Sequence, residues 1–114
     1  MANPTIELLM ASRSVRSFEP RAVEPPVRDA VLAAALRAPT AGNMMLYTII
    51  EVEDQGLKDK LAVSCDGQGF IAASPWVLVF LADYQRWMDY FELSGALGGE
   101  AAARSMASLL GGYV

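Results

Sequence analysis

Basic and hydroxyl side chains alternate over five residues near the start of the chain. The segment Ser12-Arg13-Ser14-Val15-Arg16 holds two guanidinium groups and two hydroxyls. A guanidinium can bind a phosphate through two parallel hydrogen bonds, and a serine hydroxyl can donate to a phosphate oxygen. The segment is therefore a candidate anion site. The alternative is a solvated basic turn that forms weak surface ion pairs, and local composition alone favours that alternative.

A second candidate segment is Ala38-Pro39-Thr40-Ala41-Gly42-Asn43, between a predicted helix and a predicted strand. Its small residues would let the backbone approach a flat ligand closely. The Asn43 amide could hydrogen-bond the edge of a heterocycle or simply cap the turn, and the segment by itself favours the cap. A third segment, residues 68–75, is interpreted mainly as a packing feature in which Gln68 has little chance of contacting a ligand.

The composition limits the chemistry that the side chains can supply. The chain has no histidine and a single cysteine, Cys65. Zinc chemistry, His-based acid–base mechanisms and an internal disulfide are therefore excluded within this chain. An organic cofactor would have to supply the reactivity. The net charge of −4 argues against a nucleic-acid surface, because phosphate backbones require clustered cations.

The size and hydropathy of the chain suggest a single associating domain. Its 114 residues fall in the single-domain range, which predicts one domain over residues 1–114. Hydrophobic residues make up 54% of the chain, so we expect part of the apolar surface to meet a partner. The longest apolar run, Pro75–Ala82, is far shorter than the roughly 20 residues that span a bilayer. Because Met1–Met10 has no basic region typical of a secretory signal, a cytoplasmic protein without a membrane partner is expected.

Helices and two strands are predicted to position these segments. A first helix should be capped by Thr5 and end near Ser12, and Glu24-Pro25-Pro26 should open a second helix. The next elements are a strand over Leu46–Val52 and an amphipathic helix over Gly56–Ser64. That helix should leave three charged side chains in solvent: Lys58, Asp59 and Lys60.

The second half of the chain predicts one more strand and two helices. Pro75–Ala82 is almost continuously apolar, which is typical of a central strand covered on both faces. A helical pattern follows Asp83 and ends in the glycine-rich stretch 95–99. Glu100–Leu110 should form a terminal helix that stops at two glycines.

Taken in order, these segments resemble the nitroreductase family. The family pattern is a basic Arg-Ser-x-Arg-x-Phe loop, an Ala-Pro-Ser-Ala-Gly-Asn helix end and an Ala-Pro step into an apolar strand. The corresponding residues here are Arg13 to Phe18, Ala38 to Asn43 and Ala73 to Val79. The resemblance covers about Ile6 to Arg86. It implies an α+β fold with a three-layer α/β/α arrangement, in which helices flank a central sheet, truncated relative to the family.

The resemblance also implies a cofactor, site residues and an activity. The family's basic loop binds FMN at its phosphate and ribityl chain or its pyrimidine edge, and this role is carried over to Arg13, Ser14 and Arg16. The second loop reaches the flavin across a homodimer interface, and this role is carried over to Pro39, Thr40 and Asn43. The implied enzyme reduces FMN with NAD(P)H and then passes electrons to a small-molecule acceptor such as a nitroaromatic or a quinone.

The chain also departs from the family pattern. Ser12 stands where members often have a further arginine, and Met44-Met45-Leu46-Tyr47 replaces a common x-Gln-Pro-Trp continuation. None of the family's later motifs can be identified after Arg86. Two other hypotheses therefore remain: a truncated flavin-binding or dimerising module without turnover, and a small α/β interaction domain without a ligand.

Overall fold

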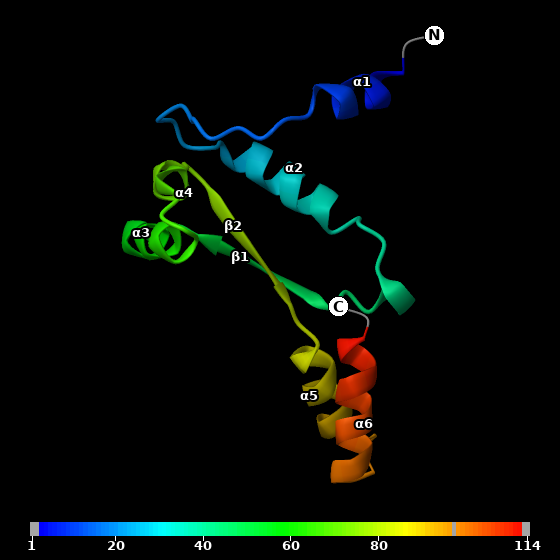
Figure 1. Cartoon of the computed structure of the whole chain (residues 1–114). Helices are drawn as coiled ribbons and strands as arrows, with labels where there is room; N and C mark the ends of the chain where they lie inside the picture. The colour runs from blue at the N-terminus through cyan, green and yellow to red at the C-terminus, as the bar shows by residue number, and fades with distance from the viewer. Residues whose placement is uncertain (1–2, 97, 113–114) are drawn as a thin grey trace. The chain divides into compact units, whose positions relative to one another are not determined.

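The backbone groups into two compact units in a computed structural model that describes residues 3–96 and 98–112. Unit 1 is formed from the ranges 1–22 and 53–77, and unit 2 from the ranges 23–52 and 78–114. Figure 1 shows the order of the helices and strands along the chain. The assignment of residues 1–114 to a single domain stays a prediction.

Helix α1 opens unit 1 and spans Pro4–Ala11. Its N-cap is Asn3, whose side-chain oxygen accepts hydrogen bonds from the backbone N–H groups of Thr5 at 3.0 Å and Ile6 at 3.4 Å. The predicted cap at Thr5 is therefore wrong, because Pro4 fits the first helical position and the helix begins before Thr5. The predicted end near Ser12 is confirmed.

A pair of helices forms the rest of unit 1. Helix α3 spans Gln55–Ser64, which confirms the predicted helix over Gly56–Ser64 with one more residue at its start, and the short helix α4, Gly69–Ala73, was not anticipated from the sequence. The turn between them holds Asp66 and Gly67 in left-handed conformations with φ of 61° and 68°. The Gln55 side-chain amide crosses between the helices and donates to the Ala72 carbonyl oxygen at 3.0 Å. Hydrogen bonding of this kind fixes α4 against α3.

Lys58 corrects a second expectation. The sequence places it on the exposed side of α3, but only 9% of the residue is exposed. Its ammonium group donates to the Ser74 carbonyl oxygen at 3.0 Å, just beyond the end of α4. A buried ammonium needs such an acceptor, and the long aliphatic stem can pack along apolar surface on the way. Lys58 thus joins α3 to the segment that leads into the second strand.

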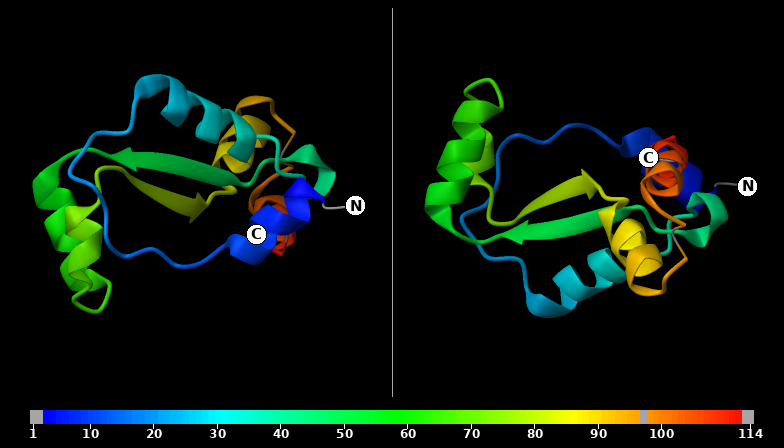
Figure 2. Two further views of the ribbon diagram at one scale, coloured as in Figure 1. Left: turned by 90° about the horizontal axis from the view of Figure 1, so that it is seen from above. Right: turned by 90° about the horizontal axis from the view of Figure 1, so that it is seen from below.

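The sheet of unit 2 consists of two neighbouring strands in the described part of the chain, β1 (Tyr47–Val52) and β2 (Val77–Ala82). Figure 2 shows that they run in opposite directions, and the Asp83 N–H donates to the Leu46 carbonyl oxygen at 3.0 Å where the pairing ends. Both predicted strands are confirmed. The expectation of a central β2 covered on both faces is not met, because β2 has one paired neighbour among the described residues.

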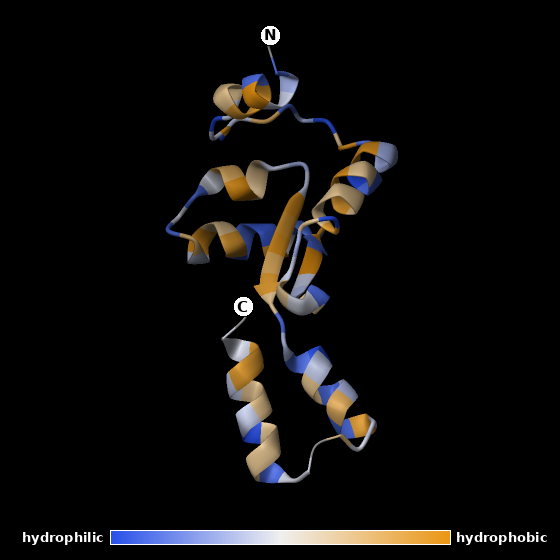
Figure 3. Cartoon of the chain, turned by 90° about the vertical axis from the view of Figure 1, so that its right-hand side faces the viewer, coloured by the Kyte–Doolittle hydropathy of each residue, from blue (hydrophilic) through white to orange (hydrophobic). Residues whose placement is uncertain are grey.

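The uncovered part of β2 is apolar. Figure 3 shows the strand coloured hydrophobic along its length, and Phe80 and Leu81 are 60% and 43% exposed. The apolar run therefore predicted a strand correctly, but the elements needed to cover it are not supplied by unit 2 alone.

Three helices complete unit 2. Helix α2, Pro25–Ala35, begins after Glu24 as predicted, and Arg28 in this helix forms an ion pair with Glu51 of β1. Helices α5 (Gln85–Leu93) and α6 (Glu100–Gly111) lie side by side (Figures 1 and 3). Leu110 of α6 is the most deeply buried side chain of the described core, at 2% exposure. Within the described residues, no helix has the length and apolar character needed to cross a membrane.

The N-cap of α3 gives a stability prediction. The Asp54 carboxylate accepts a hydrogen bond from the Leu57 backbone N–H at 2.8 Å, and replacing such a cap by alanine typically costs about 1 kcal/mol of unfolding free energy. We expect this loss for Asp54→Ala in urea unfolding followed by circular dichroism. Lys60→Ala on the same helix is the control and should change the unfolding free energy by less than about 0.5 kcal/mol. Equal effects of the two substitutions would contradict the cap assignment.

Candidate functional site

The predicted anion-binding residues lie on an extended segment of unit 1 between α1 and α2. Arg13, Ser14 and Arg16 are all exposed, and the backbone from residue 12 to residue 19 is neither helix nor strand. Within residues 3–96 and 98–112, none of the three forms a hydrogen bond or an ion pair. Two guanidinium groups and one hydroxyl are therefore available to a ligand.

Three other arginines form ion pairs with glutamates among the described residues. Arg21 lies 3.7 Å from Glu19, Arg104 lies 3.4 Å from Glu100, and Arg28 pairs with Glu51. The sequence carries 13 acidic and 9 basic residues, so carboxylates are available to pair with a cation. The surface ion pairs expected by the alternative interpretation of the basic segment are not formed by Arg13 or Arg16 among the described residues.

Arg16 has one aromatic neighbour. The central carbon of its guanidinium lies over the ring of Phe70 in α4, 5.7 Å from the ring centroid. This distance is within the range of about 6 Å over which a cation and an aromatic face attract each other. The side chain of Arg16 is thus held at its head by a contact that uses none of its N–H donors.

The second predicted segment forms a tight turn in unit 2. The short 3-10 helix η1, Ala41–Asn43, includes Gly42 at φ 57° and Asn43 at φ 54°. The carbonyl oxygen of Thr40 accepts from the Asn43 N–H at 3.0 Å, and its hydroxyl oxygen accepts from the Met45 N–H at 3.2 Å. Thr40 therefore closes the turn with both its backbone and its side chain.

Asn43 is exposed, and its side-chain amide has no hydrogen-bond partner among the residues that the structure describes. The side-chain cap favoured by the sequence is therefore wrong. Asn43 suits this position because asparagine tolerates the left-handed conformation better than most residues with a side chain. Its amide remains free to donate and to accept.

An open groove of about 380 Å³ lies beside the turn. Pro39 and Thr40 line it together with residues at the beginning of β1 and the end of β2, whereas Asn43 is not part of the lining. The remaining lining residues are Ala41, Leu46, Tyr47, Phe80, Leu81 and Ala82. The groove is mainly apolar, which suits a flat ring more than a charged group.

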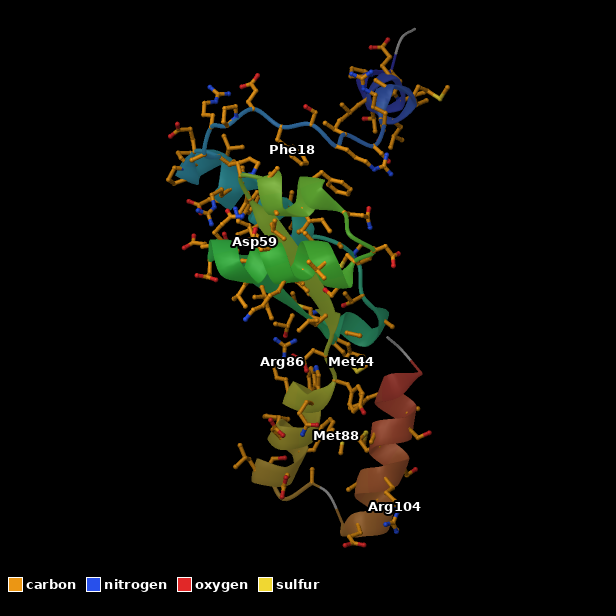
Figure 4. The ribbon with its side chains drawn as sticks, turned by 60° about the vertical axis from the view of Figure 1, so that its left-hand side comes forward. Phe18, Met44, Asp59, Arg86, Met88 and Arg104 are labelled. Carbon is orange, nitrogen blue, oxygen red and sulfur yellow. The ribbon has the colours of Figure 1, made fainter. Side chains whose placement is uncertain are left out.

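Two side chains of α5 bind the backbone just after the turn. The Trp87 indole N–H donates to the Met44 carbonyl oxygen at 2.7 Å, and the Arg86 guanidinium donates to the Met45 carbonyl oxygen. Figure 4 shows Arg86 and Met44 at the level where β2 passes into α5. These contacts could not be predicted from the sequence, because they join residues far apart in the chain and use backbone acceptors that any residue type provides.

The structure thus places the six predicted site residues in two groups. Arg13, Ser14 and Arg16 lie together on one segment of unit 1, and Pro39, Thr40 and Asn43 lie together on one turn of unit 2. Their predicted roles toward a ligand stay predictions.

A model of the nitroreductase family matches residues 9–90, which is more than half of the chain and includes both groups. The chain belongs to the nitroreductase family. The family membership predicted from the three motifs is confirmed.

Individual relatives show how much of a family member this chain represents. It is 34% identical over 87 residues to the oxygen-insensitive NADPH nitroreductase of Salmonella typhimurium, covering 76% of this chain and 36% of that protein. It is 33% identical over 84 residues to an FMN reductase of Bacillus subtilis whose name gives NAD(P)H as its donor, covering 74% of this chain and 34% of that protein. The chain therefore spans about a third of the length of these curated relatives.

The match to a solved structure covers more of this chain than the sequence matches do. The fold resembles the structure of NfrA2 from B. megaterium with a TM-score of 0.80 and 28% identity, over 98% of this chain and 47% of that one. The predicted α+β class with a nitroreductase-like fold is confirmed by the mixed helices and small sheet and by this match. The described chain corresponds to about half of that solved structure.

The contact between the two strands of unit 2 gives a prediction about titration. The Thr48 hydroxyl donates to the Asp83 carboxylate at 2.5 Å, and this hydrogen bond is the largest cause that lowers the pKa of Asp83 below its ordinary value of 3.8. Further lowering comes from the backbone N–H groups of Gln85 and Arg86 and from the charge of Arg86, while partial burial acts in the opposite direction. Thr48→Val should raise the pKa of Asp83 in an NMR titration of the carboxyl carbon.

The sign of the stability effect follows from that lowering. A carboxyl group with a lowered pKa in the folded state stabilises the fold above its unfolded pKa, and this contribution is lost as the pH falls through the folded value. The stability of the wild type should therefore fall more steeply below pH of about 4 than that of Thr48→Val. Thr48→Ser keeps the hydroxyl and is the control. An Asp83 titration that is the same in all three proteins would contradict the assignment.

Proposed function

We propose that this chain provides the N-terminal part of an FMN-dependent oxidoreductase that takes electrons from NAD(P)H. The observation that carries the proposal is the pair of unpaired guanidinium groups, Arg13 and Arg16, on a segment that lies within the family match. Support for the cofactor and the donor comes from the relatives, which are named as an NADPH nitroreductase and an FMN reductase.

The free donors on the basic segment suit the phosphate of FMN. A phosphate monoester carries close to two negative charges at neutral pH and three acceptor oxygens. Arg13 and Arg16 would supply charge-assisted hydrogen bonds, and the Ser14 hydroxyl would donate a third. Because no described carboxylate forms an ion pair with either guanidinium, binding a phosphate does not require an existing ion pair to be broken.

The turn of unit 2 would contact the ring system of a flavin held by a second copy of the chain. Pro39 and Thr40 present an apolar groove wall, and the Asn43 amide can pair with polar atoms at a ring edge. The left-handed backbone at Gly42 and Asn43 sets the direction in which the Asn43 side chain leaves the turn. In this proposal the homodimer is part of the site, because each ligand needs the basic segment of one copy and the turn of the other.

FMN supplies hydride and electron transfer when it is bound, and the protein positions it. Arg13, Ser14 and Arg16 hold its phosphate end, while Pro39, Thr40 and Asn43 shield and orient its ring end. A small nitroaromatic or quinone is the proposed acceptor class. The cytoplasmic location stays a prediction from the sequence.

FMN binding tests the proposal at Arg16. Removal of one charge-assisted contact to phosphate should cost on the order of 1.5–3 kcal/mol, which corresponds to binding that is roughly 10- to 100-fold weaker. We expect this loss for Arg16→Ala when FMN is titrated and its fluorescence quenching is measured. Arg21→Ala is the matched control, since Arg21 is already paired with Glu19 and lies outside the proposed contacts.

Two outcomes would contradict this part of the proposal. Wild-type protein that does not bind FMN would remove the cofactor from the account. Binding that weakens equally in Arg16→Ala and Arg21→Ala would indicate a general effect of positive charge and would remove Arg16 from the site.

A second candidate function is a flavin-binding or dimerising module without turnover. It is favoured by the finding that the chain spans about a third of the length of its curated relatives. The activity of those proteins can depend on residues outside the matched region. Under this function FMN and a second copy would still bind, but NAD(P)H would not be consumed.

Turnover separates the two functions. FMN-loaded protein should oxidise NADH or NADPH in the presence of menadione faster than the same concentration of free FMN does, as followed by the loss of absorbance of the nicotinamide. In analytical ultracentrifugation the FMN-loaded protein should have twice the 12.3 kDa mass of one chain. A flavin-loaded dimer whose rate equals that of free FMN would identify the module without turnover.

A further inference from the structure

We propose that Phe70 is a positioning residue that orients the guanidinium of Arg16 for the phosphate of FMN. The inference rests on the proposed function and adds a residue to it. The observation that carries it is the placement of the Arg16 guanidinium carbon over the Phe70 ring, 5.7 Å from its centroid.

The segment that carries Arg16 has few other constraints. Its backbone from residue 13 to residue 18 forms no hydrogen bond with the described residues, and its side chains from residue 13 to residue 18 are exposed. An arginine side chain has many rotamers, and ordering it at the moment of binding weakens the affinity for the ligand. A contact that holds the head group in advance reduces this cost.

An aromatic face suits this task better than a carboxylate. The ring attracts the guanidinium through its electron-rich face and accepts no strong hydrogen bond, so the N–H groups at the edge of the guanidinium plane stay available for phosphate oxygens. A carboxylate would occupy the same donors and neutralise the charge. Phe70 can therefore orient Arg16 without competing with the ligand.

Phe70 itself is firmly held. It is half-buried in α4, and α4 is tied to α3 by the hydrogen bond from the Gln55 amide to the Ala72 carbonyl oxygen at 3.0 Å. The Lys58 ammonium fixes the end of the same helix through the Ser74 carbonyl oxygen at 3.0 Å. These two hydrogen bonds hold α4, which the sequence did not predict, beside the basic segment within unit 1.

The contact can be tested in the protein without ligand. An aromatic ring shifts the NMR signals of atoms above its face upfield, so the Arg16 side-chain protons should lie upfield in the wild type and move toward ordinary values in Phe70→Leu. Leucine keeps apolar bulk and loses the ring. Phe70→Tyr keeps the ring and should retain the shift. Arg16 signals that are identical in wild type and Phe70→Leu would overturn the contact.

A double-mutant cycle tests the role of the contact in binding. Phe70→Leu should weaken FMN binding about two- to fivefold, as expected for an exposed cation–π contact of about 0.5–1 kcal/mol. In the Arg16→Ala background the same substitution should have no effect, because Phe70 acts only through Arg16. Ile71→Leu on the same helix is the control and should leave FMN affinity unchanged in both backgrounds.

Riboflavin lacks the phosphate, so it shows whether the effect of Phe70→Leu depends on the phosphate. Its affinity should be the same for wild type and Phe70→Leu, whereas FMN affinity should differ. A Phe70→Leu effect that persists in the Arg16→Ala background, or that is equal for riboflavin, would overturn the positioning role and leave a structural one. Failure of the wild type to bind FMN is a separate outcome that overturns the proposed function together with the role of Phe70 in it.

Discussion

An arginine binds an anionic ligand best when other groups of the protein do not occupy its N–H donors. In this acidic chain, three arginines pair with glutamates within their own unit, whereas Arg13 and Arg16 form no ion pair among the described residues. Unpaired guanidinium groups on an extended segment contribute nothing to folding through ion pairs. We propose that an anionic ligand supplies the negative charge that these two groups lack.

Several contacts of the described structure support the two short segments that carry the predicted site residues. In unit 1, α3 and α4 are tied together through Gln55 and Lys58, and Phe70 of α4 lies under the head of Arg16. In unit 2, Trp87 and Arg86 hold the backbone beyond the turn, and Thr40 closes the turn itself. The contacts of Phe70, Trp87 and Arg86 come from helices, and a scaffold of regular elements commonly positions a binding loop in this way.

The sequence predicted the elements better than their environments. Proline at the start of α2, β-branched residues in β1 and the Gly-Asn turn act over a few neighbouring residues, so their outcome is readable locally. Burial depends on distant partners, which explains why Lys58 was predicted to be exposed and β2 to be covered. The cap at Asn3 was missed because Thr5 is an equally good cap type, and only the geometry of Pro4 decides between them.

The same distinction applies to the site. The residue types of Arg13, Ser14 and Arg16 indicated a candidate anion site, but by themselves they favoured a solvated turn. Their role toward phosphate came from the resemblance of several segments in order to the family. The aromatic support at Phe70 was not foreseen, because it belongs to a short helix that the local pattern did not indicate and reaches the basic segment only through the fold. The free amide of Asn43 likewise required the structure, because sequence alone favoured a capped turn.

The most direct test of the account is NMR of the arginine side chains, with the Nε–Hε signals followed while FMN or riboflavin is added. We expect FMN to shift the signals of Arg13 and Arg16 and to leave that of Arg21 in place, and we expect riboflavin to move none of the three. FMN that binds without changing the signal of either Arg13 or Arg16 would contradict the claim that their unpaired guanidinium groups hold its phosphate.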